Sequence, residues 1–371
     1  MQAPLYEQIY EYIFKQITTG ELKAGERVSS EKELAIQFNV SRITTKKALE
    51  SLAQAGLITR MRGRGSFVSE IDHSLKNSTE SMEKKIMIET ARHTRIIGLL
   101  LPDISETYGF RLFRSIEEKT SALGYHIIVK FTNDKQEEEE KVIQSLIRSG
   151  VDGLIVFPVH GKHYSTELLR LVIDGFPLVL VDRYMRGIPA CSVHTNNEKA
   201  CEELTDYLLD KGHREIALLS TPTENTTTLE DRLNGFSNAF IKRGLGLNPY
   251  HFVTNLFSTL PKSFESHNIK VDQKLLRSYI HSHPTTTAFV ACEYNIARVL
   301  KREIELMGKR VPEDYEIVCF DFLNDNFDSP HFVHVRQNEE DMGSRAVELL
   351  NVLWKGETPP LQNIIDYDLM I

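Results

Sequence analysis

Residues 30–68 read SEKELAIQFNVSRITTKKALESLAQAGLITRMRGRGSFV, and the fold of the N-terminal part of the chain follows from this stretch. Ser30 precedes an apolar-periodic segment and Glu33 stands three residues later, which is the spacing of a capping box at the start of a helix. Ser41 can cap a second helix, and Gly56 fits the left-handed position that ends it. The stretch therefore predicts two helices joined by a short turn.

A β-hairpin is predicted directly after these helices. Residues 57–61 and 66–68 have the composition of strands, and residues 62–65, with sequence RGRG, can form a tight turn between them. A helix pair followed by a hairpin predicts a winged helix-turn-helix. Upstream, apolar residues at every fourth position predict a further helix that packs on this unit: Leu5, Ile9, Ile13 and Ile17.

The first turn of the second helix can enter the major groove of DNA. Its apolar residues share one face, and we expect Arg42, Thr45 and Lys46 on the other. Arg42 can make a bidentate contact with guanine, and Lys46, one turn later, can reach a base or a phosphate. Ser41, Thr44 and Thr45 are short donors suited to phosphate oxygens at a helix N-terminus.

The wing carries Arg62, Gly63 and Arg64, which make a slim basic turn that can enter a minor groove or follow the DNA backbone. The alternative is a solvated basic face on a small α/β module. The presence of a wing after the helix pair favours DNA binding over that alternative.

Residues 1–68 resemble the DNA-binding domain of GntR-family transcription regulators. This resemblance implies DNA contacts from Lys32, Arg42, Lys46 and the wing; the family usually has arginine where Lys46 stands, so phosphate binding is implied there rather than bidentate base reading. The residues that carry the resemblance are Pro4-Leu5-Tyr6, Gly20-Glu21-Leu22, Gly25-Glu26-Arg27-Val28, Glu31-Lys32-Glu33-Leu34-Ala35, Val40-Ser41-Arg42-Ile43-Thr44, Ala48-Leu49 and Gly56-Leu57-Ile58.

The chain has 371 residues and 41% hydrophobic content, which predicts a globular protein of two or three domains. The net charge is −8, but residues 1–70 hold ten Lys and Arg against eight Asp and Glu, about +2, which leaves about −10 elsewhere. An acidic body with a slightly basic head suits a repressor that meets DNA at one end. We expect a DNA-binding domain at 1–70, a polar linker at 71–94 and a ligand-binding and dimerisation domain at 95–371.

Targeting, metal and cofactor signals are not found in the sequence. The N-terminus lacks an apolar signal core and no apolar run approaches membrane-spanning length, so a cytoplasmic location is expected. The four cysteines are scattered without a CxxC, which is typical of buried thiols in a reducing compartment. The histidine pairs 281/283 and 331/334 lack a third ligand, so we predict neither a metal nor a cofactor.

From residue 95 onward, buried apolar strands alternate with helices, which predicts α/β architecture with parallel sheets covered on both faces. The alternation restarts after residue 193, so two similar lobes are expected, with ligand binding beyond the C-terminal ends of their strands. The expected strands are 96–101, 125–131, 153–157, 177–181, 216–219, 252–254, 288–292, 317–320 and 332–335; the expected helices are 110–123, 137–148, 168–173, 197–210, 231–243, 275–283, 296–307 and 340–353.

This second part resembles the effector domain of LacI-family regulators, which is similar to periplasmic sugar-binding proteins. The resemblance implies three chain crossings between lobes, with 95–192 and roughly 335–355 in one lobe. A GntR-like head on a LacI-like body resembles the arabinose-repressor (AraR) type of regulator. The carrying segments include Ile97-Gly98-Leu99-Leu100-Leu101-Pro102-Asp103, Val151-Asp152-Gly153-Leu154-Ile155, Asp182-Arg183, Asp231-Arg232-Leu233-Asn234-Gly235-Phe236 and Cys319-Phe320-Asp321.

The resemblance also implies effector contacts at strand ends. Arg232 offers a donor fork, and carboxylates after apolar strands can accept hydrogen bonds from sugar hydroxyls. Where such regulators have Asn-Asp, this chain has Glu293-Tyr294, which leaves the identity of the effector open. The candidate residues are Ser105 and Tyr108 in the loop after the first strand of the body, then Asp182, Arg232, Glu293, Asp321 and Gln337.

Together these patterns predict a dimeric transcriptional repressor that binds a palindromic operator and is released by a carbohydrate, such as arabinose, held between two lobes. One alternative is a regulator that answers to a purine or an organic acid. Another is an enzyme with a catalytic cleft and an accessory head, although the sequence contains no nucleophile–base–acid set.

Overall fold

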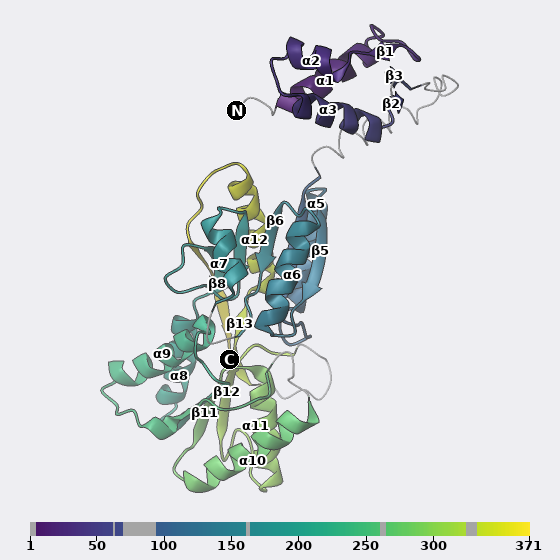
Figure 1. Cartoon of the computed structure of the whole chain (residues 1–371). Coiled ribbons are helices and arrows are strands. Elements are labelled where there is room, and N and C mark those ends of the chain that lie inside the picture. Colours follow the sequence, from purple (N-terminus) through teal and green to yellow (C-terminus); the bar gives the residue numbers. More distant parts are fainter. Residues whose placement is uncertain (1–4, 62–63, 70–93, 161–163, 260–264, 324–331) are drawn as a thin grey trace. The chain divides into compact units, whose positions relative to one another are not determined.

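The computed structural model describes residues 5–61, 64–69, 94–160, 164–259, 265–323 and 332–371 (Figure 1). The chain divides into two compact units, Met1–Arg92 and His93–Ile371, and each is treated by itself below. The linker expected at 71–94 falls, except for Thr94, outside the described residues. Among the described residues, no helix has both the length and the apolarity needed to cross a membrane.

The first unit is a winged helix-turn-helix. In its described part, three helices pack around a three-stranded antiparallel sheet of order β1-β3-β2. The sequence analysis did not anticipate β1, which pairs with the wing strand β3. The elements are α1 (Leu5–Thr18), β1 (Arg27–Val28), α2 (Glu31–Gln37), α3 (Arg42–Gln54), β2 (Ile58–Met61) and β3 (Gly65–Val68).

Local chemistry at the start of each helix of the pair explains where it begins. The Ser30 hydroxyl accepts from the Glu33 backbone N–H at 3.3 Å, and the Glu33 carboxylate accepts from the Ser30 N–H at 2.7 Å, so the predicted capping box is confirmed. Ser41 caps α3 by accepting from the Thr44 N–H at 3.3 Å. Gly56 has φ +69°, the left-handed conformation predicted for it.

The first lobe of the second unit is a parallel six-stranded sheet of order β14-β8-β7-β6-β4-β5. Helices α5 and α12 pack in the core on one face, and α6 and α7 on the other. The elements are β4 (Ile96–Leu101), α5 (Phe110–Ala122), β5 (His126–Phe131), α6 (Gln136–Arg148), β6 (Gly153–Val156), α7 (Thr166–Ile173), β7 (Leu178–Val181), β8 (Cys191–Thr195), α12 (Glu339–Trp354) and β14 (Gln362–Ile365).

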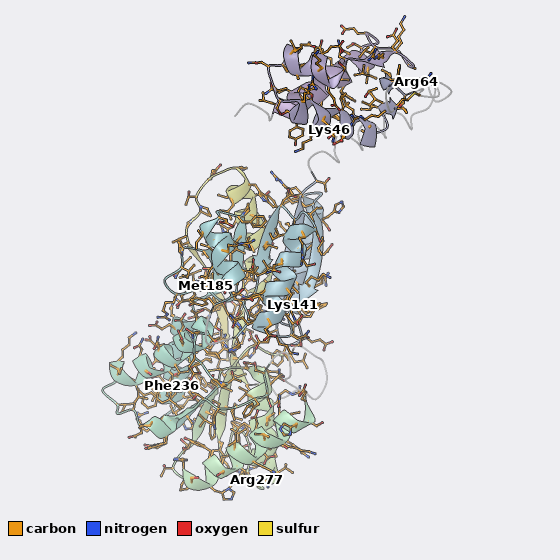
Figure 2. The ribbon with its side chains drawn as sticks, in the orientation of Figure 1. Lys46, Arg64, Lys141, Met185, Phe236 and Arg277 are labelled. Carbon is orange, nitrogen blue, oxygen red and sulfur yellow. The ribbon has the colours of Figure 1, made fainter. Side chains whose placement is uncertain are left out.

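The second lobe repeats this plan in a sheet of order β10-β9-β11-β12-β13-β15, in which only the β13–β15 pair is antiparallel. One face carries α8 and α9, with Phe236 fully buried (Figure 2), and the other carries α10 and α11. The elements are α8 (Asn197–Asp210), β9 (Ile216–Leu219), α9 (Thr227–Lys242), η2 (Pro249–His251), β10 (Phe252–Val253), α10 (Ser266–Ser282), β11 (Ala288–Ala291), α11 (Tyr294–Leu306), β12 (Glu316–Phe320), β13 (Val333–Gln337) and β15 (Tyr367–Met370).

The chain crosses between the lobes from β8 to α8, from β13 to α12 and from β14 to β15. The fold class and the three crossings agree with the sequence analysis, but one lobe boundary was wrong. Residues 335–337 were expected in the first lobe, whereas β13 hydrogen-bonds to β12 and β15 in the second. The short strands β14 and β15, which add one strand to each sheet, were also missed.

The acidic start of α6 contains one buried carboxyl group, that of Glu139. Its side chain is 1% exposed and accepts from the Val159 backbone N–H at 2.9 Å. Burial raises the pKa of Glu139 to about 7. The four cysteines are all buried and free.

Candidate functional site

The head presents exposed cations around the N-terminus of α3. Arg42 and Lys46 are exposed on α3, and Lys32 is exposed on α2. Arg64 is exposed at the start of the wing strand, and Figure 2 labels it together with Lys46. A groove runs between these elements, lined by Ser30, Glu31, Lys32, Arg42, Leu49, Arg60, Met61, Gly65 and Ser66. Arg62 and Gly63 lie outside the described residues.

The structure contradicts the predicted position of Thr45. It was expected on the outward face of α3, but it is 0% exposed and its hydroxyl donates to the carbonyls of Glu31 at 3.1 Å and Arg42 at 3.0 Å. Its position, four residues before Leu49, places it on the buried stripe, and the hydroxyl joins α2 to α3. Thr45 therefore has no free group for DNA. Thr44 is half-buried, with its hydroxyl 2.9 Å from that of Ser41.

Arg60 on β2 is a cation of the groove that the sequence analysis overlooked. Its guanidinium forms ion pairs with Glu31 on α2 and, at 3.4 Å, with Glu50 on α3. These contacts fix the hairpin against the helix pair. Its role depends on residues distant in sequence, so no local pattern could have found it.

A pocket lies between the two lobes of the second unit, at the C-terminal ends of the parallel strands. Its empty space, including the mouth that opens to solvent, is about 660 Å³. The first lobe contributes Pro102, Thr107, Tyr108, Phe157, His160, Asp182 and Arg183; the second contributes Thr228, Leu229, Arg232, Thr259, Glu293, Tyr294, Asn295, Asp321 and Gln337.

Six of the seven predicted effector residues line this pocket, and Ser105 does not. The Ser105 hydroxyl lies 2.7 Å from the Thr107 hydroxyl and accepts from the Tyr108 N–H at 3.3 Å, so it shapes the loop that carries both residues. The sequence analysis missed the remaining lining residues. Arg183 could have been noticed, because it follows Asp182 at a strand end.

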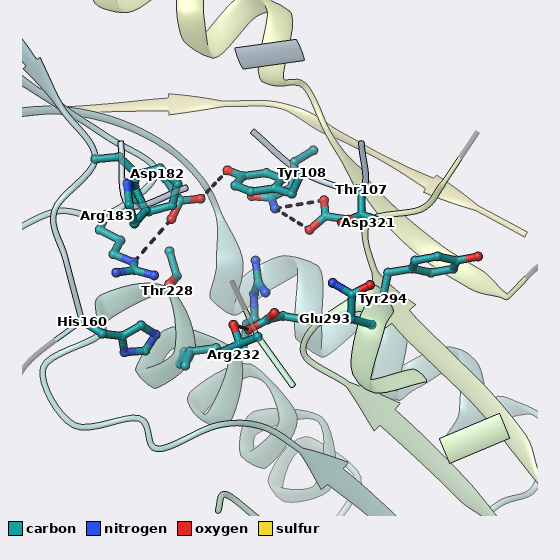
Figure 3. A pocket seen from close by; sticks show the side chains of 16 residues that line it. Thr107, Tyr108, His160, Asp182, Arg183, Thr228, Arg232, Glu293, Tyr294 and Asp321 are labelled. Atoms are coloured by element: carbon teal, nitrogen blue, oxygen red, sulfur yellow. Dashed lines mark hydrogen bonds and ion pairs between the residues drawn. The ribbon is translucent and has the colours of Figure 1, made fainter. Parts of the chain in front are cut away.

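Asp182 and Asp321 occupy matching positions in the two lobes. Each directly follows a buried strand and has positive φ, +66° and +64° respectively, which is unusual for a residue other than glycine. The Tyr108 hydroxyl donates to Asp182, and the Gln337 amide donates to both oxygens of Asp321 at 3.1 Å (Figure 3). Backbone strain of this kind concentrates at ligand sites.

Arg232 is 5% exposed and is held from three sides. Its Nε donates to Asn197 Oδ1 at 2.8 Å, its Nη1 donates to the Cys292 carbonyl, and its guanidinium stacks 3.7 Å from the Phe320 ring centre. This packing fixes the guanidinium at the pocket wall near Glu293, as Figure 3 shows.

Charge in the pocket is dominated by buried carboxylates. Burial raises the pKa of Glu293 and of Asp321 to about 7 in each case, while Arg232 opposes both shifts. Thr259 donates to Glu293 at 2.6 Å. Burial lowers the pKa of His160 to about 2, so this imidazole is neutral and its Nδ1 lies 2.7 Å from the Thr226 hydroxyl.

Some polar atoms in the pocket wall lack partners among the described residues. They are Arg183 Nε, Asn295 Oδ1 and Gln337 Oε1. Arg183 Nε is 3.7 Å from Asp182, too far for a hydrogen bond. Unpaired buried groups that line one pocket are the feature expected of a binding site without its ligand. No group of three or more potential metal ligands occurs in the described part of the chain.

Comparison with known proteins agrees with this architecture. Residues 5–68 match the gntR family of bacterial regulatory proteins, and residues 205–369 match the periplasmic binding protein-like domain. The arabinose metabolism transcriptional repressor of Geobacillus stearothermophilus is 28% identical over 354 residues, covering 94% of this chain and 90% of that protein. The ribose operon repressor of Halalkalibacterium halodurans is 28% identical over 314 residues, covering 84% of each.

Among solved structures, the transcription regulator CcpA of Lactococcus lactis has a TM-score of 0.65 at 22% identity, covering 75% of this chain and 98% of that one. That likeness shows the fold. A winged helix-turn-helix joined to a two-lobed ligand-binding domain defines a DNA-binding transcription regulator. This chain has that organisation: its head is similar to the gntR family of bacterial regulatory proteins, and its body contains a periplasmic binding protein-like domain.

Proposed function

We propose that this protein is a transcriptional repressor whose head binds an operator and whose pocket binds a sugar that releases it from DNA. The observation that carries this proposal is the pocket between the lobes, in which Asp182, Arg232, Asp321 and Gln337 form polar walls around an open space. Carboxylates and a guanidinium suit the many hydroxyls of a sugar. Relatives named for arabinose and ribose support this class of effector.

The proposal also covers the domain organisation and the oligomeric state of the protein. Residues 1–70 form the DNA-binding domain, 71–94 the linker and 95–371 the effector and dimerisation domain of a cytoplasmic homodimer. One head covers too few base pairs for useful specificity, so two heads on a palindrome are required. The proposed DNA contacts are Lys32, Ser41, Arg42, Thr44, Lys46, Arg62, Gly63 and Arg64, and the proposed effector contacts are Tyr108, Asp182, Arg232, Glu293, Asp321 and Gln337.

A single binding experiment tests the core of this function. The operator is first recovered by in vitro selection with the full-length protein. Fluorescence anisotropy of that DNA is then followed while L-arabinose, D-ribose, D-xylose and D-galactose are added. Release by one sugar supports the proposal. Failure to select any DNA sequence, or a sugar that tightens DNA binding, contradicts it.

Contacts outside the pocket hold the lobes together. Tyr184, between β7 and β8 of the first lobe, donates through its hydroxyl to Asp231 on α9 of the second lobe, with both oxygens at 3.1 Å. The Thr227 hydroxyl donates to the Tyr184 carbonyl at 3.0 Å, and Arg186 lies 3.3 Å from Asp231. We call these residues the lobe latch. Because α9 also carries Arg232, one helix serves both latch and pocket, and lobe closure is coupled to effector binding.

Replacing Tyr184 by phenylalanine is expected to raise the sugar concentration for half-release by about 3- to 10-fold, the worth of one net hydrogen bond. The ring and its packing on His194, with centres 4.9 Å apart, remain. Anisotropy titration of the operator complex measures the shift. Tyr250→Phe is the control, because that hydroxyl contacts Glu215 within one lobe at 3.3 Å. Equal shifts in both variants would contradict a role for the latch.

Sugar affinity is expected to fall as the pH drops from 8 to 6. Glu293 and Asp321, each with a pKa near 7, accept sugar hydroxyls when ionised, so binding favours the deprotonated forms and releases protons near neutral pH. Calorimetry in two buffers of different ionisation enthalpy measures that release. Asp321→Asn should reduce the number of protons released on sugar binding, and an uptake of protons on binding would contradict the expectation.

The thermal stability of the sugar-free protein is expected to change with pH in the opposite direction to its sugar affinity. The folded pKa values of these carboxyls exceed the unfolded ones, so between about pH 4 and 7 the folded state binds more protons. These groups therefore stabilise the ligand-free effector domain as the pH falls from 8 to 5. The pH dependence of sugar affinity thus cannot be attributed to unfolding.

A further inference from the structure

The sequence departs from related regulators at Glu293-Tyr294, and the structure shows what each of these residues does. Glu293 already accepts from Thr259 at 2.6 Å, and burial raises its pKa to about 7, so it is only partly ionised at neutral pH. The Tyr294 ring packs edge-on against Phe322 and Phe332, with ring centres 5.8 and 6.0 Å apart. Tyr294 thus belongs to the apolar core, and in Figure 3 its ring points away from Glu293.

The next residue, Asn295, supplies an amide at this place. It lies in the first turn of α11, is 4% exposed and lines the pocket. Its Oδ1 accepts no hydrogen bond from any residue that the structure describes. A buried acceptor without a donor costs free energy, so an arrangement of this kind is expected where a ligand provides the donor.

Gln337 presents a second acceptor of the same kind. It is 2% exposed, and both of its hydrogen bonds to Asp321 come from the amide nitrogen, at 3.1 Å. When Asp321 is ionised, its carboxylate can only accept, so the Gln337 nitrogen must face it and Oε1 is the atom left free. Oε1 likewise has no partner among the described residues. The second lobe therefore presents two amide oxygens that require donors.

We propose that Asn295 is a specificity-determining residue of the effector site, which, with Gln337, accepts hydrogen bonds from two hydroxyl groups of a polyol. This inference rests on the proposed function and extends it. A ligand edge that offers only acceptors, such as a carboxylate or a phosphate, leaves both amide oxygens unpaired. A sugar that lacks one of the two hydroxyls leaves one unpaired, and its affinity falls accordingly.

The test uses the full-length protein and measures sugar affinity by calorimetry for L-arabinose, D-ribose, D-xylose and D-galactose. The monodeoxy derivatives of the sugar that binds are then measured. Deletion of the sugar hydroxyl that donates to Asn295 is expected to weaken binding to the parent protein by about 5- to 100-fold. Asn295→Ala should bind the complete sugar weakly and lose that discrimination, while Asn295→Asp, which keeps an acceptor, should retain it.

Thermal unfolding separates this role from a structural one. Asn295→Ala removes an unpaired buried group, so the ligand-free melting temperature should be unchanged or raised, whereas loss of a structural contact would lower it. Asn351→Ala is the matched control. Asn351 lies on α12, and its side chain accepts from the Tyr125 hydroxyl at 2.9 Å. Replacement of Asn351 should therefore lower the melting temperature and leave the relative affinities for the deoxy sugars unchanged.

The outcomes are distinguishable. If the parent protein binds sugar and Asn295→Ala shows the same affinities for the sugar and for every deoxy derivative, the role of Asn295 is overturned and the proposed function stands. A lowered melting temperature with unchanged deoxy discrimination also overturns it. If no sugar binds the parent protein, the proposed function fails and this inference fails with it.

Discussion

Replacing Arg232 by alanine is expected to weaken sugar binding by roughly 10- to 100-fold, because a charge-assisted hydrogen bond is worth about 1.5–3 kcal/mol. The operator should still bind, so the variant would be a repressor that sugar no longer releases. A second effect adds to the loss. Arg232 lowers the pKa of Glu293 and of Asp321, and without it both carboxyls are more fully protonated at neutral pH. Anisotropy titration of the operator complex measures both operator affinity and release.

Controls are needed because Arg232 is buried and bonded to Asn197 and Cys292. Arg277→Ala, on α10 of the same lobe (Figure 2), removes an arginine that donates to the buried Glu303 at 2.7 Å and does not line the pocket. It should lower stability without changing sugar release. Arg232→Lys keeps the charge but loses the planar fork, and we expect an intermediate affinity. Release of Arg232→Ala at the parent's sugar concentration would contradict the assignment.

Replacing Arg42 by alanine is expected to abolish specific operator binding. A bidentate arginine–guanine contact discriminates by roughly 1–3 kcal/mol, and a dimer loses two, so about 100-fold or more is expected at physiological salt. The side chain is exposed in the first turn of α3, so the fold should not change. Gel-shift assays with operator and scrambled DNA measure the loss of discrimination, and calorimetry should show unchanged sugar binding.

Lys46→Ala provides the contrast within the same helix. Lys46 is exposed, and its ammonium lies 3.8 Å from Glu50, so it is free to move to a phosphate. Its removal should weaken operator and scrambled DNA about equally and reduce the salt dependence of binding. If Arg42→Ala behaved in this way as well, Arg42 would be a backbone contact and its proposed base reading would be wrong.

Patterns of a few residues predicted much of this fold. The capping box at Ser30 and Glu33 depends only on neighbours in sequence, and it formed as expected. The strands β4, β6, β7, β9 and β11 are runs of apolar residues and glycine, which indicated the α/β architecture, whereas the buried strand β8, with sequence CSVHT, is not such a run and was not predicted. The strands β14 and β15 lack such runs, since QNII and YDLM alternate between exposed positions and buried or partly buried ones at sheet edges. Their identity as strands comes from their partners, β8 and β13, which no local pattern contains.

The errors in the sites have the same origin. Thr45 was predicted to be a surface residue because its partner is distant in sequence: its hydroxyl donates to the Glu31 carbonyl, fourteen positions away. Glu139 is buried because its carboxyl accepts from the Val159 N–H, twenty positions away, and nothing at the start of α6 itself indicates that contact. Six of the candidate residues that line the pocket were predicted from positions that the resemblance to a family implies, and two of them, Asp182 and Asp321, directly follow strands. Asn295 was not found, because its importance depends on the absence of a partner in three dimensions.

The order in which the strands occur along the chain has a consequence for biosynthesis. The described elements of the head all lie within residues 5–68, so this domain can fold as soon as it has left the ribosome. Neither lobe can complete its sheet so early, since β14 and β15 follow every other strand and each closes a different lobe. During translation, a nascent chain therefore has a finished DNA-binding domain before it has a pocket that can answer to a sugar. Truncation before β14 would leave an intact head joined to a body in which neither sheet is complete.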